Sequence, residues 1–510
     1  MTILRKILFI IIYSKFIKTN NNYVFNDLNF RKLDFTNYRQ IKSFIFKKKF
    51  YKFDNRYIQS FDFLNFSKNL GGKIGISLSK TTIFEWYILN KNKINYPWSG
   101  DFGSRRLINL LYNYEFINSS STEHETKLLN KIILLHIHRN IFELKFKNVN
   151  KITSYDLIAN NLSYYILKKN NNRIKKFTIY IINKQIDKLG MHKSYNILEH
   201  AKFLNNLTEL KNIFLYFETK ISKDIDEILI KMKSVLNSYF HIDGSIPLFN
   251  GANNNYTSII ANSLNKDEYL KSRNFSNSDN GLAFFSGKNK KLFFDVVQPS
   301  SRDISNNLNA GTLSFEYSCF GEKLITNCGA SESLGKNPEY LRYSAAHSTI
   351  ILQNTNISEI NENNSSIKFP QSVTFESNQD KNLFVLIGTH NGYQNKFSKI
   401  IKRQLEINDE ENKIYGEDSI ITTKYNNNRV IYHIRFHLVA GIIYNFTNNK
   451  KNIILKSKLN NIYIFKSDIE LMVEDSILVD KNITIPTKQI VIKGITNNNK
   501  QVRKWSIEKI

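Results

Sequence analysis

The sequence predicts an array of α-helices followed by an antiparallel β-sandwich. Apolar residues recur with a helical period from about Phe61 to Phe240, and with a period of two after about Ser272. A polar stretch without periodicity, "NKDEYLKSRNFSNSDNG", separates the two regions. With 510 residues, 41% of them hydrophobic, the chain is too long for a single core and suggests two or three globular domains.

The helical domain is predicted over residues 61–270, after an N-terminal extension of residues 1–60. In "SRRLINLLYNYEF", Leu107, Leu111 and Tyr114 fall on one helical stripe. Several later segments carry apolar residues on more than one face, and short polar links such as "KNVNKITS" separate them. Helices joined by short links form antiparallel hairpins. We therefore expect a layered helical array, either open or closed into a ring.

The β-domain is predicted over residues 271–510. "KKLFFDVVQ", "STIILQNT" and "RVIYHIRFHLVAG" read as strands, and turn clusters such as "FGEK" and "NDEE" join many strands as hairpins. A long series of antiparallel strands without intervening helices predicts a sandwich.

The charge balance indicates either a polyanionic partner or a compositional bias. The chain has 72 Lys+Arg against 44 Asp+Glu, a net charge of +28. Nucleic acid, an anionic lipid surface and an acidic polysaccharide would each suit this field. The basic residues are spread along the chain and form no nucleic-acid motif, so we expect no nucleic-acid partner. The abundance of Lys, Asn and Ile also fits an AT-rich coding bias, which would explain the charge without any polyanionic partner.

The N-terminus and the cysteines leave the compartment open. "MTILRKILFIIIYSKF" imitates an export signal but is followed by no small-residue cleavage site. Its apolar run is too short to span a bilayer, so a buried strand or helix is expected. Cys319 and Cys328 form no zinc pattern, and a single bridge across a hairpin remains an alternative.

Five motifs, taken together in order and spacing, resemble one family. They are "WSGDFGSRRLINLL", "GMHKSYN", "HIDGSIPLFNGA", "NAGTLSFEYSCFGEKLITNCG" and "RYSAAHSTIIL". This series is similar to the heparinase II/III-like polysaccharide lyases, of the heparinase and alginate lyase types. The resemblance implies an (α/α) toroid with a β-sandwich, and a glycosaminoglycan or alginate substrate. It also implies a periplasmic or cell-envelope location, although the weak export signal leaves the cytoplasm open.

The resemblance implies that the family's metal site is lost in this chain. The family's two histidine ligands and its aspartate ligand fall on Asn309, His347 and Asn327, and a further catalytic histidine falls on Asn307. Amide oxygens are poor zinc ligands, so we expect no tightly held zinc and no other cofactor. The chain is then either a metal-independent lyase or a catalytically degenerate glycan-binding or envelope-assembly protein.

Lyases of this kind act by β-elimination, which needs a neutralised uronate carboxylate, a base and an acid. The resemblance and these needs give four candidate catalytic residues: His192, Asn196, Tyr256 and His347. Each has a structural alternative. Ser194 or Asn196 could cap a helix beginning at Ile197, Tyr256 could simply pack, and His347 could hydrogen-bond to backbone. If "GMHKSYN" enters a helix, His192 and Asn196 would share one face.

Four further residues are candidates for substrate binding: Arg342, Arg302, Trp98 and Asn307. Either arginine could bind a uronate or sulfate through two hydrogen bonds, or could form a structural ion pair. Trp98 could stack on a sugar ring or anchor a helix in the core. The sequence does not distinguish these alternatives, nor does it define the glycan or the oligomeric state.

Overall fold

A computed structural model describes most of the chain after the N-terminal extension. It covers residues 56–94, 96–169, 172–217, 223–254, 260, 281–298, 309–331, 339–360, 366–424, 429–447, 449–480, 483–496 and 499–510. The chain forms two compact units: residues 1–185 with 203–229, and residues 186–202 with 230–510. No helix among the described residues is long and apolar enough to cross a membrane.

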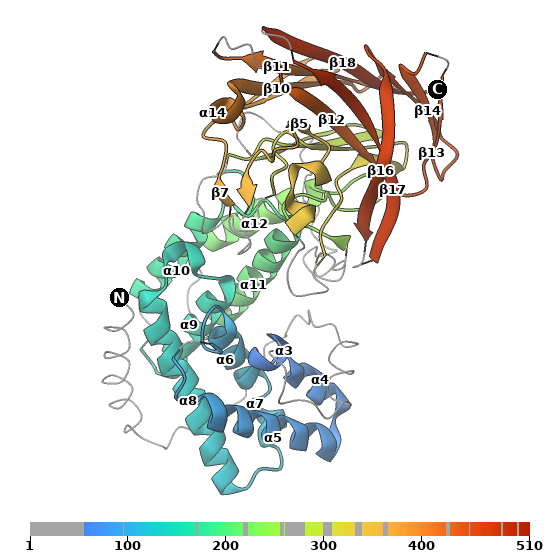
Figure 1. Ribbon diagram of the computed structural model, residues 1–510. Helices are drawn as coiled ribbons and strands as arrows, with labels where there is room; N and C mark the ends of the chain where they lie inside the picture. Colours follow the sequence, from blue (N-terminus) through green and yellow to red (C-terminus); the bar gives the residue numbers. More distant parts are fainter. Residues whose placement is uncertain are drawn as a thin grey trace. The chain divides into compact units, whose positions relative to one another are not determined.

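The first unit is helical, as predicted (Figure 1). Its helices are α3 (Arg56–Gln59), α4 (Phe63–Leu70), α5 (Gly72–Asn90), α6 (Phe102–Tyr112), α7 (Tyr114–Asn118), α8 (Glu123–Phe146), α9 (Ser154–Ile166) and α10 (Asn172–Gln185). The two units share α11 (Ile197–Tyr216) and α12 (Lys223–Ser238), so the predicted boundary at residue 270 stays a prediction.

Capping boxes fix the starts of α8 and α9. The Thr122 hydroxyl accepts from the Glu125 N–H at 3.2 Å, and the Glu125 carboxylate accepts from the Thr122 N–H at 2.8 Å. Thr153 and Asp156 form the same reciprocal pair at the start of α9. Each box satisfies two N–H groups that a helix end would otherwise leave without partners.

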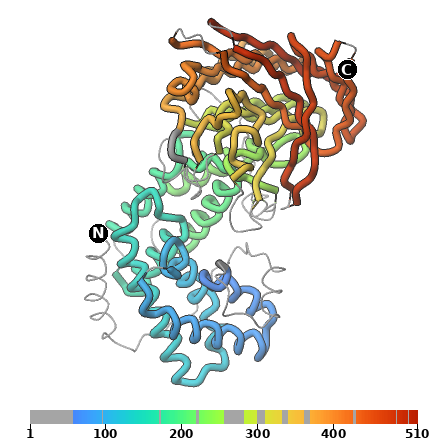
Figure 2. Tube along the Cα trace, in the orientation of Figure 1, coloured from blue at the N-terminus to red at the C-terminus, as the bar shows by residue number. Residues whose placement is uncertain are grey.

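The second unit contains two large antiparallel sheets, seen from yellow to red along the trace in Figure 2. The first has the order β1-β2-β3-β4-β12-β17-β16, with β5 paired to β12, and the second has the order β13-β14-β15-β18-β11-β10-β9-β8. The strands of the first sheet are β1 (Leu282–Ser286), β2 (Lys290–Asp295), β3 (Phe315–Cys319), β4 (Glu322–Thr326), β5 (Ile350–Leu352), β12 (Ile431–Leu438), β16 (Leu471–Asp480) and β17 (Ile483–Ile495).

The strands of the second sheet are β8 (Val373–Asp380), β9 (Leu383–His390), β10 (Lys399–Asn408), β11 (Lys413–Thr422), β13 (Ile443–Phe446), β14 (Asn452–Lys456), β15 (Ile462–Ser467) and β18 (Lys500–Lys509). A small pair, β6 (Glu359–Ile360) and β7 (Ser366–Lys368), lies outside both sheets. Burial alternates strictly along β10, as expected for a strand with one face on a core. One apolar cluster contains residues from both sheets, so the predicted sandwich is confirmed.

A buried ion pair ties the second sheet to the first. Arg403 of β10 forms two hydrogen bonds with Asp418 of β11, at 2.6 and 3.0 Å. Its Nη1 atom also donates to the main-chain oxygens of Leu313 and Ser348, at 2.8 and 2.7 Å. Because Ser348 follows His347 in the chain, this guanidinium fixes the backbone beside a candidate site residue.

Candidate functional site

The turn at residues 190–196 precedes α11. Because this helix begins at Ile197, His192 and Asn196 lie in the turn, and the helical face that they would have shared does not form. The Asp187 carboxylate accepts from the N–H groups of Leu189 and Met191, at 2.9 and 2.8 Å, and so holds the start of the turn.

Hydrogen bonds to Ser194 define the tautomer of His192. The Ser194 N–H donates to Nδ1 of His192 at 3.2 Å, and the Ser194 hydroxyl lies 2.8 Å from the same atom. That hydroxyl accepts from the Asn196 N–H at 3.3 Å, so its own hydrogen points to His192. The neutral His192 ring therefore carries its proton on Nε2. Burial lowers the pKa of the half-buried His192 to about 4.

Asn196 caps α11. Its Oδ1 accepts from the N–H groups of Leu198 and Glu199, at 2.8 and 3.3 Å. Its Nδ2 donates one hydrogen to the main-chain oxygen of Asn250 at 3.0 Å. The capping alternative is therefore observed, and one amide hydrogen of Asn196 remains for another acceptor.

Asn250 joins the two halves of the candidate site, and the sequence reasoning missed it. Its Nδ2 donates to the main-chain oxygen of Tyr195 at 3.3 Å, and its Oδ1 accepts from the Asn309 N–H at 3.2 Å. Asn250 is buried and has φ of +52°, a conformation that asparagine tolerates better than most residues. An asparagine just before a glycine, as in "PLFNGA", is the sequence feature that could have indicated a residue with positive φ.

His347 lies buried next to Asn309. The ring packs against Gly311, where an added Cβ would meet its Cγ atom at 2.9 Å. Among the residues that the structure describes, neither ring nitrogen of His347 nor Oδ1 of Asn309 has a hydrogen-bond partner. Burial lowers the pKa of His347 to about 4, so the ring is neutral at pH 7.

Glu316 is the most heavily bonded side chain near His347. Its Oε2 accepts from Nε2 of His241 and Nζ of Lys323, each at 2.9 Å. Its Oε1 accepts from the N–H groups of Leu248 and Asn327, at 3.1 and 3.0 Å. Burial alone would raise the pKa of Glu316, but the Lys323 charge and the His241 hydrogen bond lower it to about 2. His241 is thus part of this network.

The residues around His347 do not fit a zinc ion. Asn327 uses its Oδ1 to accept from the Ser348 N–H at 3.0 Å, and its Nδ2 faces Glu316 at 3.3 Å. His347 would then be the one strong donor beside two amides, whereas zinc sites are built from His, Cys and carboxylate ligands. In the part of the chain that the structure describes, no three His, Cys, Asp or Glu residues are placed to hold a metal ion.

Of the other candidates, Arg342 and Trp98 are buried. Arg342 lies in the segment leading to His347, and its main-chain oxygen accepts from the Ala310 N–H at 2.8 Å. Trp98 is 5% exposed and lies in the helical unit, where its Nε1 donates to the Asn90 oxygen at 2.9 Å. So little exposure leaves no ring face for a sugar in this structure, which favours the anchoring alternative. Tyr256, Arg302 and Asn307 lie outside the described residues.

The cysteines are free and buried, so the alternative of a bridge between them is not realised. Cys319 ends β3, whereas Cys328 follows β4 and lies with its Sγ 3.6 Å from Nδ1 of His437. Burial raises the pKa of each thiol to about 11, so neither is a reactive thiolate at pH 7.

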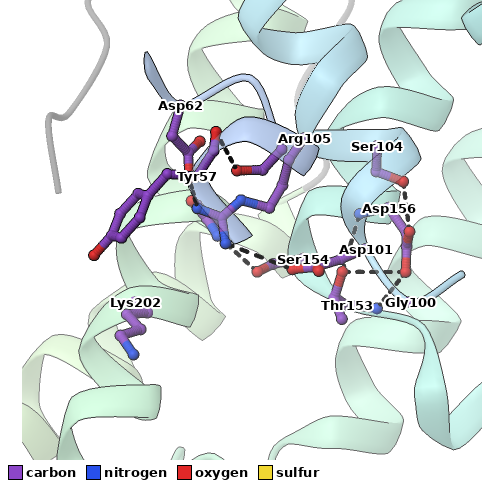
Figure 3. Close-up of polar contacts among 12 residues, drawn as sticks. Tyr57, Asp62, Gly100, Asp101, Ser104, Arg105, Thr153, Ser154, Asp156 and Lys202 are labelled. Carbon is purple, nitrogen blue, oxygen red and sulfur yellow. Dashed lines mark hydrogen bonds and ion pairs between the residues drawn. The ribbon is translucent and has the colours of Figure 1, made fainter. Parts of the chain in front are cut away.

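The helical unit has a polar cluster of its own (Figure 3). Ser104 of α6 donates to the Asp156 carboxylate at 2.5 Å, and Lys147 also contacts that carboxylate. These three residues line a pocket together with Trp98 and Arg139. The contacts join α6 to the start of α9, and they explain why this part of "WSGDFGSRR" is polar within a packed array.

Comparison with known proteins finds one family model that matches the second half of the chain. Residues 271–506 match the family model described as Heparinase II/III-like, C-terminal. No match to the chain was found among curated protein sequences.

Three solved structures share this fold over most of their length. The crystal structure of heparinase III superposes with a TM-score of 0.70 at 13% identity, covering 89% of this chain and 76% of that one. Heparan sulfate lyase HepC from Pedobacter heparinus gives 0.62 at 13% identity, covering 99% and 88%. A heparinase III gene product with methylated lysines gives 0.67 at 10% identity, covering 98% and 88%. At these identities the likeness shows the fold, a helical toroid followed by a β-sandwich.

Proposed function

Because the chain belongs to the heparinase II/III-like family through its C-terminal domain, we propose that it cleaves an acidic, uronic-acid-containing glycan by β-elimination. The observation that carries this proposal is the turn that holds His192 and Asn196 next to Asn250. As part of the proposal we place the protein in the periplasm or cell envelope, in keeping with the family resemblance.

His192 is suited to neutralise the substrate carboxylate. Ser194 occupies Nδ1, so the neutral ring has an N–H donor at Nε2 and no base at that atom. A hydrogen bond from Nε2 to a uronate carboxylate would stabilise the negative charge that develops when the C5 proton leaves. The remaining amide hydrogen of Asn196 is suited to the same carboxylate. We therefore assign His192 the role of donor rather than base.

The elimination then needs one proton removed and one delivered. A base takes the C5 proton, the C–H electron pair forms the C4–C5 double bond, the C4–O bond breaks, and an acid protonates the leaving oxygen. We assign these transfers to Tyr256, which follows Asn250 in the chain. His347 is 1% exposed and therefore receives no step.

A second function is favoured by the residues around His347. Asn309 and Asn327 stand where the family resemblance places metal ligands, and the Asn327 side chain is bonded within the protein, accepting from the Ser348 N–H at 3.0 Å. A fold can persist after its activity is lost. In this alternative the chain is a catalytically degenerate glycan-binding or envelope-assembly protein.

Product absorbance tests the proposal. Heparan sulfate, hyaluronan, chondroitin sulfate and alginate are each incubated with the protein, and absorbance of the new C4–C5 double bond is followed in the short ultraviolet. We expect activity on at least one glycan, and a loss of about 100-fold in kcat for His192→Phe, because phenylalanine keeps a ring but has no N–H donor for the carboxylate. His124→Phe, at an exposed position on α8, is the matched control and should keep the wild-type rate.

The outcomes separate the alternatives. Binding of a glycan without absorbance growth favours the degenerate protein. If neither binding nor absorbance occurs with any of these glycans, both functions are rejected. A wild-type rate in His192→Phe would show that the site is wrongly assigned.

A further inference from the structure

One end of the second sheet has an outer face that is both apolar and basic. Strands β13, β14 and β15 form this end, and β13 is the last strand of the sheet (Figure 1). The register places Ile443 of β13, Lys456 of β14 and Ile462 of β15 in one row across the three strands. Ile454 of β14 and Ile464 of β15 are paired in the next row. We call these five residues the β13–β15 face.

The β13–β15 face is turned to solvent. The residues that alternate with it along β14 and β15 belong to the apolar core: Ile453, Leu455, Tyr463 and Phe465. Successive residues of a strand face opposite sides of the sheet, so the isoleucines of the face point away from that core. Ile443, Ile462 and Ile454 are 64%, 40% and 37% exposed. A large apolar surface can therefore reach them without any change in the fold.

Positive charge surrounds these isoleucines. Residues 439–467 contain no Asp or Glu but have five lysines, at positions 450, 451, 456, 458 and 466. Glu508 of β18 borders this stretch and forms an ion pair with Lys466 at 3.1 Å. Glu322 also borders it, and accepts from Nδ2 of Asn461 at 2.8 Å. The lysines outnumber these acids, so the charge at this end of the sheet stays positive.

The opposite end of the same sheet has different chemistry. Along β8, Glu376 and Asp380 are exposed, and the strand contains no Lys or Arg. A coding bias toward Lys and Ile would act on both ends of the sheet alike. Such a bias therefore does not account for the combination found on β13–β15.

Protection of an open sheet edge does not explain the lysines either. Edge strands commonly carry charged residues that prevent pairing with another chain. The last strand, β13, is Ile-Tyr-Asn-Phe and carries no charge. The lysines lie instead on β14 and in the turns before and after it, close to the exposed isoleucines. This placement suits a partner surface that is both apolar and negatively charged.

An anionic lipid bilayer combines these two properties. Isoleucine side chains can enter the boundary between head groups and acyl chains, while lysine ammonium groups stay at the level of the phosphates. One such signal binds weakly, whereas an apolar and a basic signal together give stable attachment. A second copy of this chain would bring lysines against lysines. A nucleic acid or an acidic glycan would give the isoleucines no apolar contact.

We propose that the β13–β15 face attaches the protein to the surface of an anionic lipid bilayer. The isoleucines supply the apolar contact, and the lysines at positions 450, 451, 456 and 458 supply the attraction to the lipid phosphates. The proposal goes beyond the proposed function, and it holds whether or not the chain is an active lyase.

Sedimentation with lipid vesicles tests the attachment. We expect the full chain to bind vesicles of one part phosphatidylglycerol to three parts phosphatidylcholine. Binding to phosphatidylcholine alone should be at least about 10-fold weaker, because each lysine then loses its attraction to anionic lipid. Raising the salt concentration from about 0.05 to 0.3 M should also weaken binding to the anionic vesicles, because the Debye length falls.

Two double variants separate the apolar and the basic contributions. Ile443→Thr/Ile462→Thr keeps β-branched side chains and should weaken vesicle binding about 10-fold, or about 3-fold per isoleucine. Lys456→Gln/Lys458→Gln should weaken binding about 20-fold at low salt, which corresponds to about 5-fold per charge. The lysine variant should also depend less on salt than the wild type does.

Matched controls make the same changes elsewhere on the β-sandwich unit. Ile483→Thr/Ile495→Thr alters exposed residues of β17 in the first sheet. Lys381→Gln/Lys424→Gln removes two exposed charges, between β8 and β9 and after β11. Both controls should bind anionic vesicles as the wild type does.

Several results would overturn the proposal. A wild-type protein that does not bind the anionic vesicles, or that binds phosphatidylcholine equally well, rejects a bilayer of this class. Equal losses in the control variants would assign the binding to net charge rather than to the β13–β15 face. An oligomer that only the isoleucine variant dissociates, without vesicle binding, would assign the face to a second copy.

A soluble glycan distinguishes the remaining alternative and the proposed function. If the lysine variant loses affinity for a heparan sulfate hexasaccharide while the isoleucine variant keeps vesicle binding, the face binds glycan and the proposal is rejected. Vesicle binding lost only in the two face variants supports it. Product absorbance, which none of these variants should change, reports on the proposed function separately.

Discussion

Replacing Glu316 by glutamine should destabilise the β-sandwich unit strongly. Oε2 of this fully buried carboxylate accepts from Nε2 of His241 and Nζ of Lys323, each at 2.9 Å. In Glu316→Gln an amide oxygen can keep the backbone donors at the Oε1 position. The amide nitrogen, itself a donor, must then face the donors of His241 and Lys323. The buried Lys323 ammonium also loses its counter-charge.

The cost follows from the burial of both charges. The Lys323 side chain is 6% exposed and that of Glu316 is 0% exposed, so water cannot replace the lost partner. Removing one member of a buried ion pair costs about 3–5 kcal/mol. Glu316→Gln/Lys323→Met removes both charges, and we expect it to recover at least about 2 kcal/mol of this loss.

Urea denaturation followed by the β-sheet circular dichroism signal measures these differences. The matched control is Glu417→Gln, since Glu417 lies 3.9 Å from Lys504 with the two side chains 32% and 74% exposed. This variant should lose less than about 1 kcal/mol. The reasoning is refuted if Glu316→Gln is as mild as the control, or if the double variant is no more stable than the single one.

Two further predictions concern pH and Asn250. The pKa values of His347 and His437 are lowered by burial to about 4 and about 3, so both rings are neutral when folded. The contribution of each neutral ring to the free energy of unfolding is complete above the unfolded pKa of about 6.5. It is lost as pH falls toward 4, and the loss reaches about 2 kcal/mol per ring at pH 5. Urea midpoints measured between pH 7.5 and 5 check this, and a flat profile contradicts it. Asn250→Ala should lower the free energy of unfolding by about 2 kcal/mol and weaken glycan binding, because it removes the bonds to Tyr195 and Asn309. Asn250→Gly, which suits the positive φ, should be less destabilised than the alanine variant, and the reverse order would exclude backbone strain as a cause.

The fold was predictable because periodicity reports burial directly. The period of two in "KIIKRQLEIN" became β10, with every second residue buried. The site was predictable only in part. Sequence showed that Asn196 could cap a helix or bind substrate, but the choice depends on Asn250, 54 residues away. Asn250 itself is one asparagine in an asparagine-rich chain, and local sequence does not reveal a contact made at that distance.

Glu316 could have been recognised from sequence by a physical argument. It stands in "LSFEYSC", a run that is otherwise apolar or small, and β3 is buried at every residue. A carboxylate in such a strand needs compensating charges and donors. Lys323 on the adjacent strand was the nearest cation in the hairpin, whereas His241 is 75 residues away and could not be paired with it from sequence.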